Sequence, residues 1–538
     1  MGEDGDKKAD PVSTTGLANE EDAAALAKLG YVQELRRNFT MIEVFGIAFS
    51  IMGLLPSIAS TLAYSIPSGP AGMVWSWFLA SMFIMTVGLA MADLGSAMPT
   101  SGGLYWLVIE RLHAAGYSNT LGLVGGLVSI DYGFSLMLLS VVVIAKDGNY
   151  TPSNGVVYAV FLGCILCHGV LASTMSKIMG KLQTAFVVMN FVLIIATVIV
   201  LPVGRGSQRN SAHFIFAELD NLTEWPTGWT FMLAWLSPIW TIGAFDSCVH
   251  MSEEAANAVI AVPWGIVMSI GSCWLFGWIC VIVIAGCMDP NVENLLGTSF
   301  GQPMAQIYYD AVGKRGAIAM MTLVFIVQFM MGLSITVAAS RQTWAFSRDG
   351  ALPFSGYFRK INTKLGHIPF RAIWGCVGLG AVLGLLSLIA PAAAQALFSL
   401  AVAGNNVAWG TPIFCRLVWG QHKFKPGPFY TGRFSIPLGW TAVVFLIFGV
   451  ILSMFPVGGP DPTAAEMNYT VVINSAVWGG ALLYYFLDAR KWFTGPKITL
   501  DLDNLSESQE RAIVVEGLEV ENVKTDANVE PGAAKLQA

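Results

Sequence analysis

The segment from Trp235 to Ala255 reads WLSPIWTIGAFDSCVHMSEEA and combines features that a continuous buried helix avoids. Its first half is apolar enough to lie in protein or lipid, yet Pro238 and Gly243 interrupt it and Asp246 follows at once. Proline removes a backbone donor and clashes with the preceding turn, and glycine relieves the strain of a bend. We therefore expect a helix that is interrupted around Gly243.

The composition of the whole chain places this segment in a membrane. Of its 538 residues, 55% are hydrophobic and only 12% are charged, whereas about 25% of the residues of a soluble protein are charged. The mean hydropathy is +0.62. A soluble core of this size does not need so much apolar surface, so we expect an all-α polytopic membrane protein. All eight cysteines lie in or at the ends of apolar segments, which predicts no disulfide framework.

Apolar segments long enough to cross a bilayer, which takes about 20 residues, occur at twelve places. They are residues 42–64, 73–95, 121–145, 155–173, 182–203, 229–250, 263–287, 316–340, 371–391, 394–418, 437–456 and 469–487. The stretch GSAMPTSGGLYWLVIERLHAAG between the second and third segments is too short and polar to cross, and we expect it at the membrane face. The chain thus divides into a polar tail (1–38), a twelve-span domain (39–497) and a second, flexible polar tail (498–538).

The positions of the basic residues test this topology. With both termini in the cytosol, the 29 Lys and Arg residues divide as 24 on the inner side and 5 on the outer side. The five outer residues are Lys146, Arg205, Arg209, Lys314 and Arg315. An excess of Lys and Arg in the inner loops is the usual arrangement in membrane proteins, and inverting one span would destroy it.

A second interrupted span indicates that the interruption around Gly243 has a functional role. Residues 49–64, FSIMGLLPSIASTLAY, carry Gly53 and Pro56 in mid-membrane. For either span alone a plain proline kink is an equally good explanation. However, the interruptions fall in spans one and six, which correspond if five spans are followed by another, inverted five. Paired interruptions of this kind indicate a binding site near the middle of the membrane in secondary transporters.

The interrupted backbone suggests what this site binds. We expect free amide groups at Ser57, Ile58 and Ala59, because a half-helix would begin there, and the positive start of a helix attracts a carboxylate. The carbonyl groups around residues 51–53 and 242–244 would face an amine. The two charged ends of an amino acid suit such a site.

Two carboxylates inside spans are candidates for proton coupling, Asp246 and Asp131. An ionised carboxylate at the bilayer centre costs about 2.5 to 3.5 kcal/mol on insertion scales, so a functional role is the default expectation. For Asp131, a structural hydrogen bond to a neighbouring helix is an equal alternative. Glu253 and Glu254 lie at the inner end of span six, where capping or gating is expected.

Six motifs resemble those of a known family. LGYVQELRRNFTMIEVFGIAFSIMGLLPSIASTL (29–62), PTSGGLYW (99–106), SNTLGLVGGLVSIDYGF (118–134), FDSCVHMSEEA (245–255), SRQTWAFSRDGALPFS (340–355) and KPGPFYTGRFS (425–435) occur in this order. They resemble fungal permeases of the amino acid/polyamine/organocation superfamily, in particular the branch of GABA and choline permeases. The resemblance covers residues 28–497. It implies a leucine-transporter-type fold of five-plus-five inverted repeats and two extra helices, with proton-coupled uptake of a small amine or amino acid.

The resemblance also implies the substrate contacts. They fall on Gly53, Leu54, Leu55, Pro56, Ser57 and Ile58, and on Thr241, Ile242, Gly243, Ala244, Phe245 and Asp246. GABA is the expected substrate, with choline or a polyamine as the alternative, because Tyr132, Trp240 and Phe245 could cage a quaternary ammonium. Some proton-coupled relatives carry a lysine in span five, where this chain has only Asn190 as a polar candidate.

Other classes of protein are disfavoured. The six histidines are scattered and neither G-x-S-x-G nor H-E-x-x-H occurs, so the sequence does not predict an enzyme. It predicts no cofactor, metal site or nucleic-acid partner, and it contains no recognisable selectivity filter of a channel. We expect the plasma membrane as the location, with the vacuolar membrane as the alternative.

Overall fold

The computed structural model describes residues 37, 39–100, 114–175, 178–362, 365, 368–389, 391–422, 424–463 and 467–487. Within these ranges the chain forms helices and two isolated β-bridges, one of which pairs Phe39 with Ala255. Both tails apart from Arg37, and most of the segment expected at the membrane face, lie outside the described residues.

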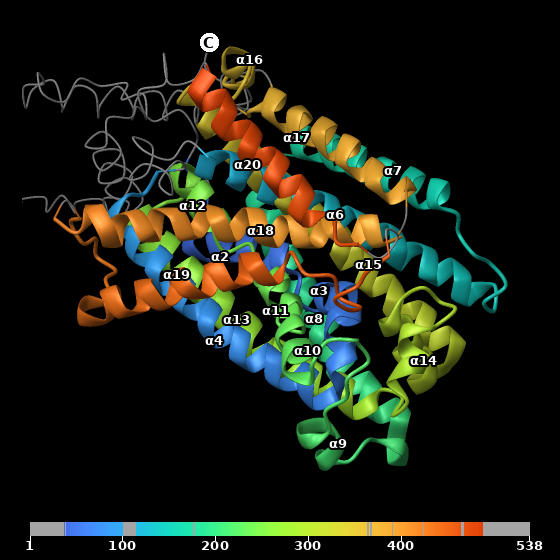
Figure 1. The fold of residues 1–538 in the computed structure, drawn as a ribbon. Coiled ribbons are helices and arrows are strands. Elements are labelled where there is room, and N and C mark those ends of the chain that lie inside the picture. The colour runs from blue at the N-terminus through green and yellow to red at the C-terminus, as the bar shows by residue number, and fades with distance from the viewer. Residues whose placement is uncertain are drawn as a thin grey trace, which may run out of the picture.

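Each of the twelve expected spans coincides with one helix or with two or three successive shorter helices (Figure 1). They are α2 (Met41–Met52) with α3 (Leu54–Ser65), α4 (Gly69–Ala97), α6 (Ala114–Ala145), α7 (Asn154–Thr174), α8 (Met179–Arg205), α10 (Thr227–Leu233) with α11 (Leu236–Thr241) and α12 (Ser247–His250), α13 (Ala258–Cys287), α15 (Pro303–Arg348), α17 (Phe370–Leu383), α18 (Pro391–Cys415), α19 (Ser435–Leu452) and α20 (Thr470–Leu487).

Length and composition support a membrane-spanning role for most of these helices. Nine helical stretches among the described residues are long and apolar enough to cross a bilayer, and one of them, Met41–Ala97, contains both α2–α3 and α4. Two of the twelve spans are absent from this set: the sixth, which is divided into short helices, and the one formed by α18. The prediction of an all-α polytopic membrane protein is therefore confirmed.

Short helices mark the two ends of the bundle. Helices α9 (Ala212–Ala217) and α14 (Val292–Leu296) lie at one end, and α16 (Ser355–Phe358) lies at the other (Figure 1). Helix α15 is 46 residues long, and Gly313, with φ 69°, separates its first segment from its membrane span. Lys314 pairs with Asp147 at 2.6 Å, so the loop after α6 and the bend in α15 meet at the same end.

Helix α6 lies at the centre of the packing that positions the site. It packs along α15 and α18, while α4 packs along α13 and α19. The two interrupted spans contact each other through α3 and α11 and lie between these groups of helices. The breaks are therefore enclosed by protein on all sides, the condition under which irregular backbone is tolerated at membrane depth.

Candidate binding site between the two interrupted helices

The first interruption is a single residue, Gly53, in a left-handed conformation (φ 39°, ψ 64°). A side chain there would be strained, and an added Cβ would lie 2.0 Å from the sulfur of Met331 on α15. Only glycine therefore fits. The hydroxyl of Ser57 donates to the carbonyl of Met52 at 2.5 Å and so satisfies one of the carbonyl groups that the end of α2 leaves free.

The amide groups at this break differ from the expectation. The N–H of Ser57 donates to the carbonyl of Gly53 at 2.9 Å, and Ile58 and Ala59 lie further inside α3. The expectation of free amides at these three residues is therefore wrong, because α3 begins three residues earlier than proline alone suggested. The N–H groups that lack a helical partner belong to the first turn, at Leu54 and Leu55.

The second interruption is longer and runs from Ile242 to Asp246, between α11 and α12. A Cβ on Gly243 would lie 2.8 Å from the carbonyl oxygen of Trp240 and 3.1 Å from that of Ile239, so the chain cannot turn here with a larger residue. The carbonyl of Gly243 accepts a hydrogen bond from the side-chain amide of Asn405 on α18 at 3.5 Å. A residue of a different span thus stabilises the break.

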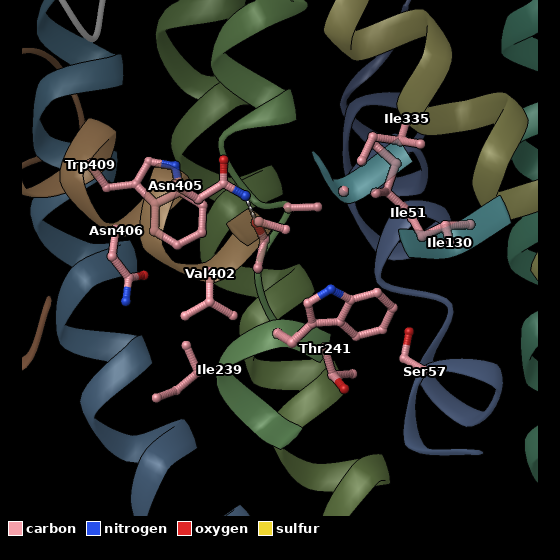
Figure 2. A pocket seen from close by; sticks show the side chains of 15 residues that line it. Ile51, Ser57, Ile130, Ile239, Thr241, Ile335, Val402, Asn405, Asn406 and Trp409 are labelled. Atoms are coloured by element: carbon pink, nitrogen blue, oxygen red, sulfur yellow. Dashed lines mark hydrogen bonds between the residues drawn. The ribbon is translucent and has the colours of Figure 1, made fainter. Parts of the chain in front are cut away.

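A small cavity lies between the two interruptions (Figure 2). Its volume is about 30 Å³, enough for one or two water molecules. Fifteen residues line it: Ile51, Ser57, Gly126, Ile130, Ile239, Trp240, Thr241, Gly243, Ala244, Ile335, Ala401, Val402, Asn405, Asn406 and Trp409. The cavity must widen before it can hold an amino acid.

Of the twelve expected contact residues, four line this cavity: Ser57, Thr241, Gly243 and Ala244. The other eight do not line it: Gly53, Leu54, Leu55, Pro56, Ile58, Ile242, Phe245 and Asp246. Most of these lie in the two breaks and shape the backbone. Phe245 instead packs its ring 4.4 Å from that of Trp409, which belongs to the cavity wall.

An aromatic pair lies between this cavity and a second, larger one. The rings of Trp240 on α11 and Phe398 on α18 lie 4.9 Å apart. Phe398 also lines a second cavity of about 530 Å³, together with Tyr64, Tyr132 and residues 298–303 near α14. This pair of rings therefore connects the walls of the two cavities, with Trp240 lining the central one and Phe398 the larger one.

Buried ion pairs close the opposite end. Glu253 accepts two hydrogen bonds from Arg348 of α15, at 2.9 and 3.0 Å, and Glu254 accepts one from Arg341 at 2.9 Å. The backbone of Phe39, just before α2, bonds to Glu254 and Ala256. The ends of spans one, six and eight are thus joined.

Asp246 is the last residue of the second break, is fully buried and does not line the cavity. One carboxylate oxygen lies 3.2 Å from the side-chain amide of Asn119 on α6 and 3.3 Å from Nε2 of His250, one helical turn further along. The other oxygen has no hydrogen-bond partner among the described residues. The interaction with Asn119 connects span six to span three.

Asp131 also pairs with a histidine. Its carboxylate lies 3.1 Å from Nδ1 of His168 on α7, and both side chains are fully buried. Cys164 lies 3.9 Å from the same imidazole. A Cβ on Gly332 of α15 would come within 2.3 Å of both partners, so this glycine makes room for the pair. Asp131 thus forms a hydrogen bond to a neighbouring helix, which is the geometry expected if its role is structural and not in proton coupling.

Sequence reasoning missed five polar residues of these sites: Asn119, His168, His250, Asn405 and Asn406. His250 follows Asp246 at the i, i+4 spacing that places two side chains on one helix face, and this signal was available. An imidazole inside a span is also a functional candidate by itself. The sequence around the two asparagines of α18 offered no comparable signal, because their place in the cavity wall depends on which face of α18 packs against span six.

These features define a class of protein. A membrane bundle whose first and sixth spans are interrupted around a central cavity, closed at both ends by side chains, is a secondary transporter with a leucine-transporter-type fold. Two crystal structures of mutants of a manganese transporter from Eremococcus coleocola share this fold, with TM-scores of 0.53 and 0.54 and 14% identity. Each comparison covers 90% of this chain and 97% of the other.

The sequence comparisons identify the family. A family model described as amino acid permease matches residues 39–477. The chain is 44% identical to the GABA-specific permease of Saccharomyces cerevisiae, over 90% of this chain and 88% of that protein. It is 31% identical to amino-acid permease BAT1 of Arabidopsis thaliana, over 92% of this chain and 99% of that one. The chain belongs to the amino acid permease family and is a multi-pass membrane transporter, not an enzyme.

Proposed function

We propose that the chain moves a small amino acid, GABA in particular, across a membrane by proton symport with alternating access. The twelve predicted contact residues shape or line the site in this proposal, and the domain boundaries are those expected from the sequence. The similarity to a GABA-specific permease supports the choice of substrate. The structural observation that supports it most directly is that no charged side chain lines the central cavity.

None of the fifteen residues that line the cavity is an acid, a base or a histidine. A ligand with a net charge would lose its hydration in this cavity without gaining a counter-charge, and that loss is costly at membrane depth. A zwitterionic amino acid brings both charges and has no net charge. The cavity therefore favours an amino acid over a cation.

Choline or a polyamine remains the second candidate. The rings of Trp240 and Trp409 in the cavity wall offer aromatic faces to a cation, and a desolvated cation–π contact contributes about 2 kcal/mol. This contribution is smaller than the cost of leaving a cation without a counter-ion in a low-dielectric site. We therefore place these cations second.

Alternating access is supported by the asymmetry of the two ends. A cavity of about 530 Å³ reaches Phe398 from one end, whereas paired Glu and Arg side chains close the other. Opening the site to the second side would require these ion pairs to separate while the aromatic pair stays closed, and opening it to the first would require the aromatic rings to move apart. Asp246 and Asp131 are the proton-coupling candidates, each with a histidine partner.

The charge distribution supports an inner location for the end that carries Glu253 and Arg348, with both termini in the cytosol. The plasma membrane is the proposed location, and the vacuolar membrane is the alternative.

Competition of labelled GABA uptake into vesicles tests the substrate. Unlabelled proteinogenic amino acids, choline and putrescine are the competitors, and GABA should compete best. Choline or putrescine competing better than GABA would replace the proposal by the second candidate.

Replacing sodium at fixed pH should leave uptake unchanged, whereas a protonophore should abolish accumulation. Transport that needs sodium and ignores the protonophore would contradict proton symport.

A further inference from the structure

Three side chains that can bind a metal ion lie together inside the bundle. They are Asp131 of α6 and Cys164 and His168 of α7. One ligand atom from each residue, a carboxylate oxygen, the thiol sulfur and an imidazole nitrogen, lies within 4.8 Å of the other two. Asp131 and His168 are fully buried and Cys164 is 5% exposed. None of the three lines the central cavity, so the substrate site does not account for them.

The packing of three helices brings these side chains together. Cys164 and His168 are four residues apart on α7, a spacing that places both on one face of the helix. Helices α6, α7 and α15 contact one another. Gly332 of α15 lies directly against Asp131 and His168, since a Cβ there would collide with both, and the ring of Phe329 lies 4.4 Å from the imidazole. Only this packing unites the ligands, which is why the sequence predicted no metal site.

The carboxylate of Asp131 is only partly satisfied by its histidine partner. Both of its oxygens lie 3.1 Å from Nδ1 of His168. However, Oδ1 has no hydrogen-bond partner among the described residues, and native proteins leave few buried polar atoms in this state. A hydrogen-bonded pair of Asp131 and His168 explains neither this oxygen nor the adjacent thiol of Cys164. A bound cation would give both atoms a partner.

The distances suit a tetrahedral metal ion. Bonds of about 2.0 to 2.2 Å to nitrogen and oxygen, and of about 2.3 Å to sulfur, place tetrahedral ligands about 3.3 to 3.6 Å apart. Nδ1 of His168 lies 3.1 Å from the carboxylate of Asp131 and 3.9 Å from the sulfur of Cys164. The oxygen and the sulfur lie within 4.8 Å of each other. Side-chain movements of about 1 Å would therefore complete the geometry.

The types of ligand and their charges select the ion. A thiolate and an imidazole suit Zn²⁺, and they suit Cd²⁺ as a softer ion of the same charge. Binding requires the thiolate, the carboxylate and an imidazole whose Nδ1 carries no proton, and the displaced protons pass to water. The divalent cation and its three ligands then have no net charge, which lowers the cost of burial at membrane depth. A water molecule would occupy the fourth tetrahedral position.

We propose that Asp131, Cys164 and His168 form a binding site for Zn²⁺ or a similar divalent cation, and that the bound ion inhibits transport. Ile130, the neighbour of Asp131 on α6, lines the central cavity. An ion that joins α6 to α7 beside this wall opposes the widening that the cavity needs before it can hold a substrate. The inhibition rests on the proposed function, whereas the metal site does not.

Binding of Cd²⁺ to the purified full-length protein tests the site directly, because a cadmium–thiolate bond gives an ultraviolet charge-transfer band. We expect this band in the unsubstituted protein, its displacement by excess Zn²⁺, and its loss in Cys164→Ser and in Cys164→Ala. Cys167→Ser is the matched control and should keep the band, since Cys167 belongs to the same helix but is exposed. No band in the unsubstituted protein, or an equal band without the Cys164 thiol, would overturn the site.

Uptake of GABA into vesicles tests the inhibition. At a Zn²⁺ concentration equal to the dissociation constant, half of the protein binds the ion, so the rate of uptake should fall about twofold. Cys167→Ser should be inhibited to the same extent, whereas Cys164→Ser should resist. Equal inhibition of Cys164→Ser would overturn the regulatory role. Protein that binds Cd²⁺ through Cys164 but takes up no amino acid would instead contradict the proposed function, so the two failures are distinguishable.

Discussion

The hydroxyl groups of Thr61 and Ser237 lie 2.7 Å apart and join the two interrupted spans. Thr61 belongs to α3 and Ser237 to α11, and both are buried. Thr61 also donates to the carbonyl of Ser57, next to the first break. Helices α3 and α11 are therefore linked next to Ser57, which lines the cavity.

A double-mutant cycle measures this link. Thr61→Val and Ser237→Ala each remove one hydroxyl, and the double variant removes both. We expect a coupling free energy of about 0.6 to 1.5 kcal/mol, the range for hydrogen bonds between membrane helices. Thermal unfolding of the purified protein in detergent provides the measurement. Strictly additive effects would show that the two hydroxyls do not interact.

The second break depends on Gly243. We expect Gly243→Ala to abolish uptake while the protein still inserts, because the added Cβ would lie 2.8 Å from the carbonyl oxygen of Trp240. Uptake at equal amounts of membrane protein is the measurement. Gly378→Ala in α17 is the control, since a Cβ there meets no atom within 4 Å. Normal uptake by Gly243→Ala would mean that the break does not require this glycine.

Asp246 is the first candidate for proton coupling. Asp246→Asn keeps the shape of the side chain and removes its titration, so substrate exchange should persist while accumulation against a gradient is lost. Exchange and net uptake are compared in the same vesicles, with and without an imposed proton gradient. If Asp246→Asn accumulates GABA fully and with unchanged pH dependence, the residue is structural and Asp131 is the next candidate.

The pair of Asp131 and His168 supports a separate prediction. His168→Phe leaves the carboxylate of Asp131 buried without its partner, and we expect a loss of about 3 kcal/mol or more of stability. Adding Asp131→Asn to this variant removes the charge and should restore part of the loss. Thermal unfolding is the measurement. A His168→Phe protein that is fully stable but cannot accumulate substrate would instead assign proton coupling to this pair.

The ion pair of Glu253 with Arg348 closes one end of the site. Arg348→Glu places two carboxylates together and should reduce uptake strongly, because like charges at this distance repel and the closed state is lost. The reversed pair, Glu253→Arg with Arg348→Glu, should recover part of the activity. Uptake and membrane insertion are both measured. Failure of the reversed pair to recover any uptake would mean that these side chains have a role beyond mutual attraction.

The sequence by itself determined the membrane class, the positions of the twelve spans and the two interruptions. These are local properties, because the length of an apolar segment and the backbone limits of Pro56, Gly53 and Gly243 do not depend on distant residues. It also identified Asp246 and Asp131 as costly charges, since a carboxylate in a span is costly wherever it lies. The start of α3 lies three residues earlier than expected, because the break is confined to Gly53 and the helix resumes at Leu54.

Only the tertiary structure decided which side chains meet. His168 reaches Asp131 from the next helix, Asn405 reaches the carbonyl of Gly243 across 162 positions, and Arg348 reaches Glu253 across 95. Such contacts depend on how each helix is rotated about its axis and which neighbour it packs against. An apolar helix carries little pattern that fixes this rotation, because both its buried and its lipid-facing sides are hydrophobic.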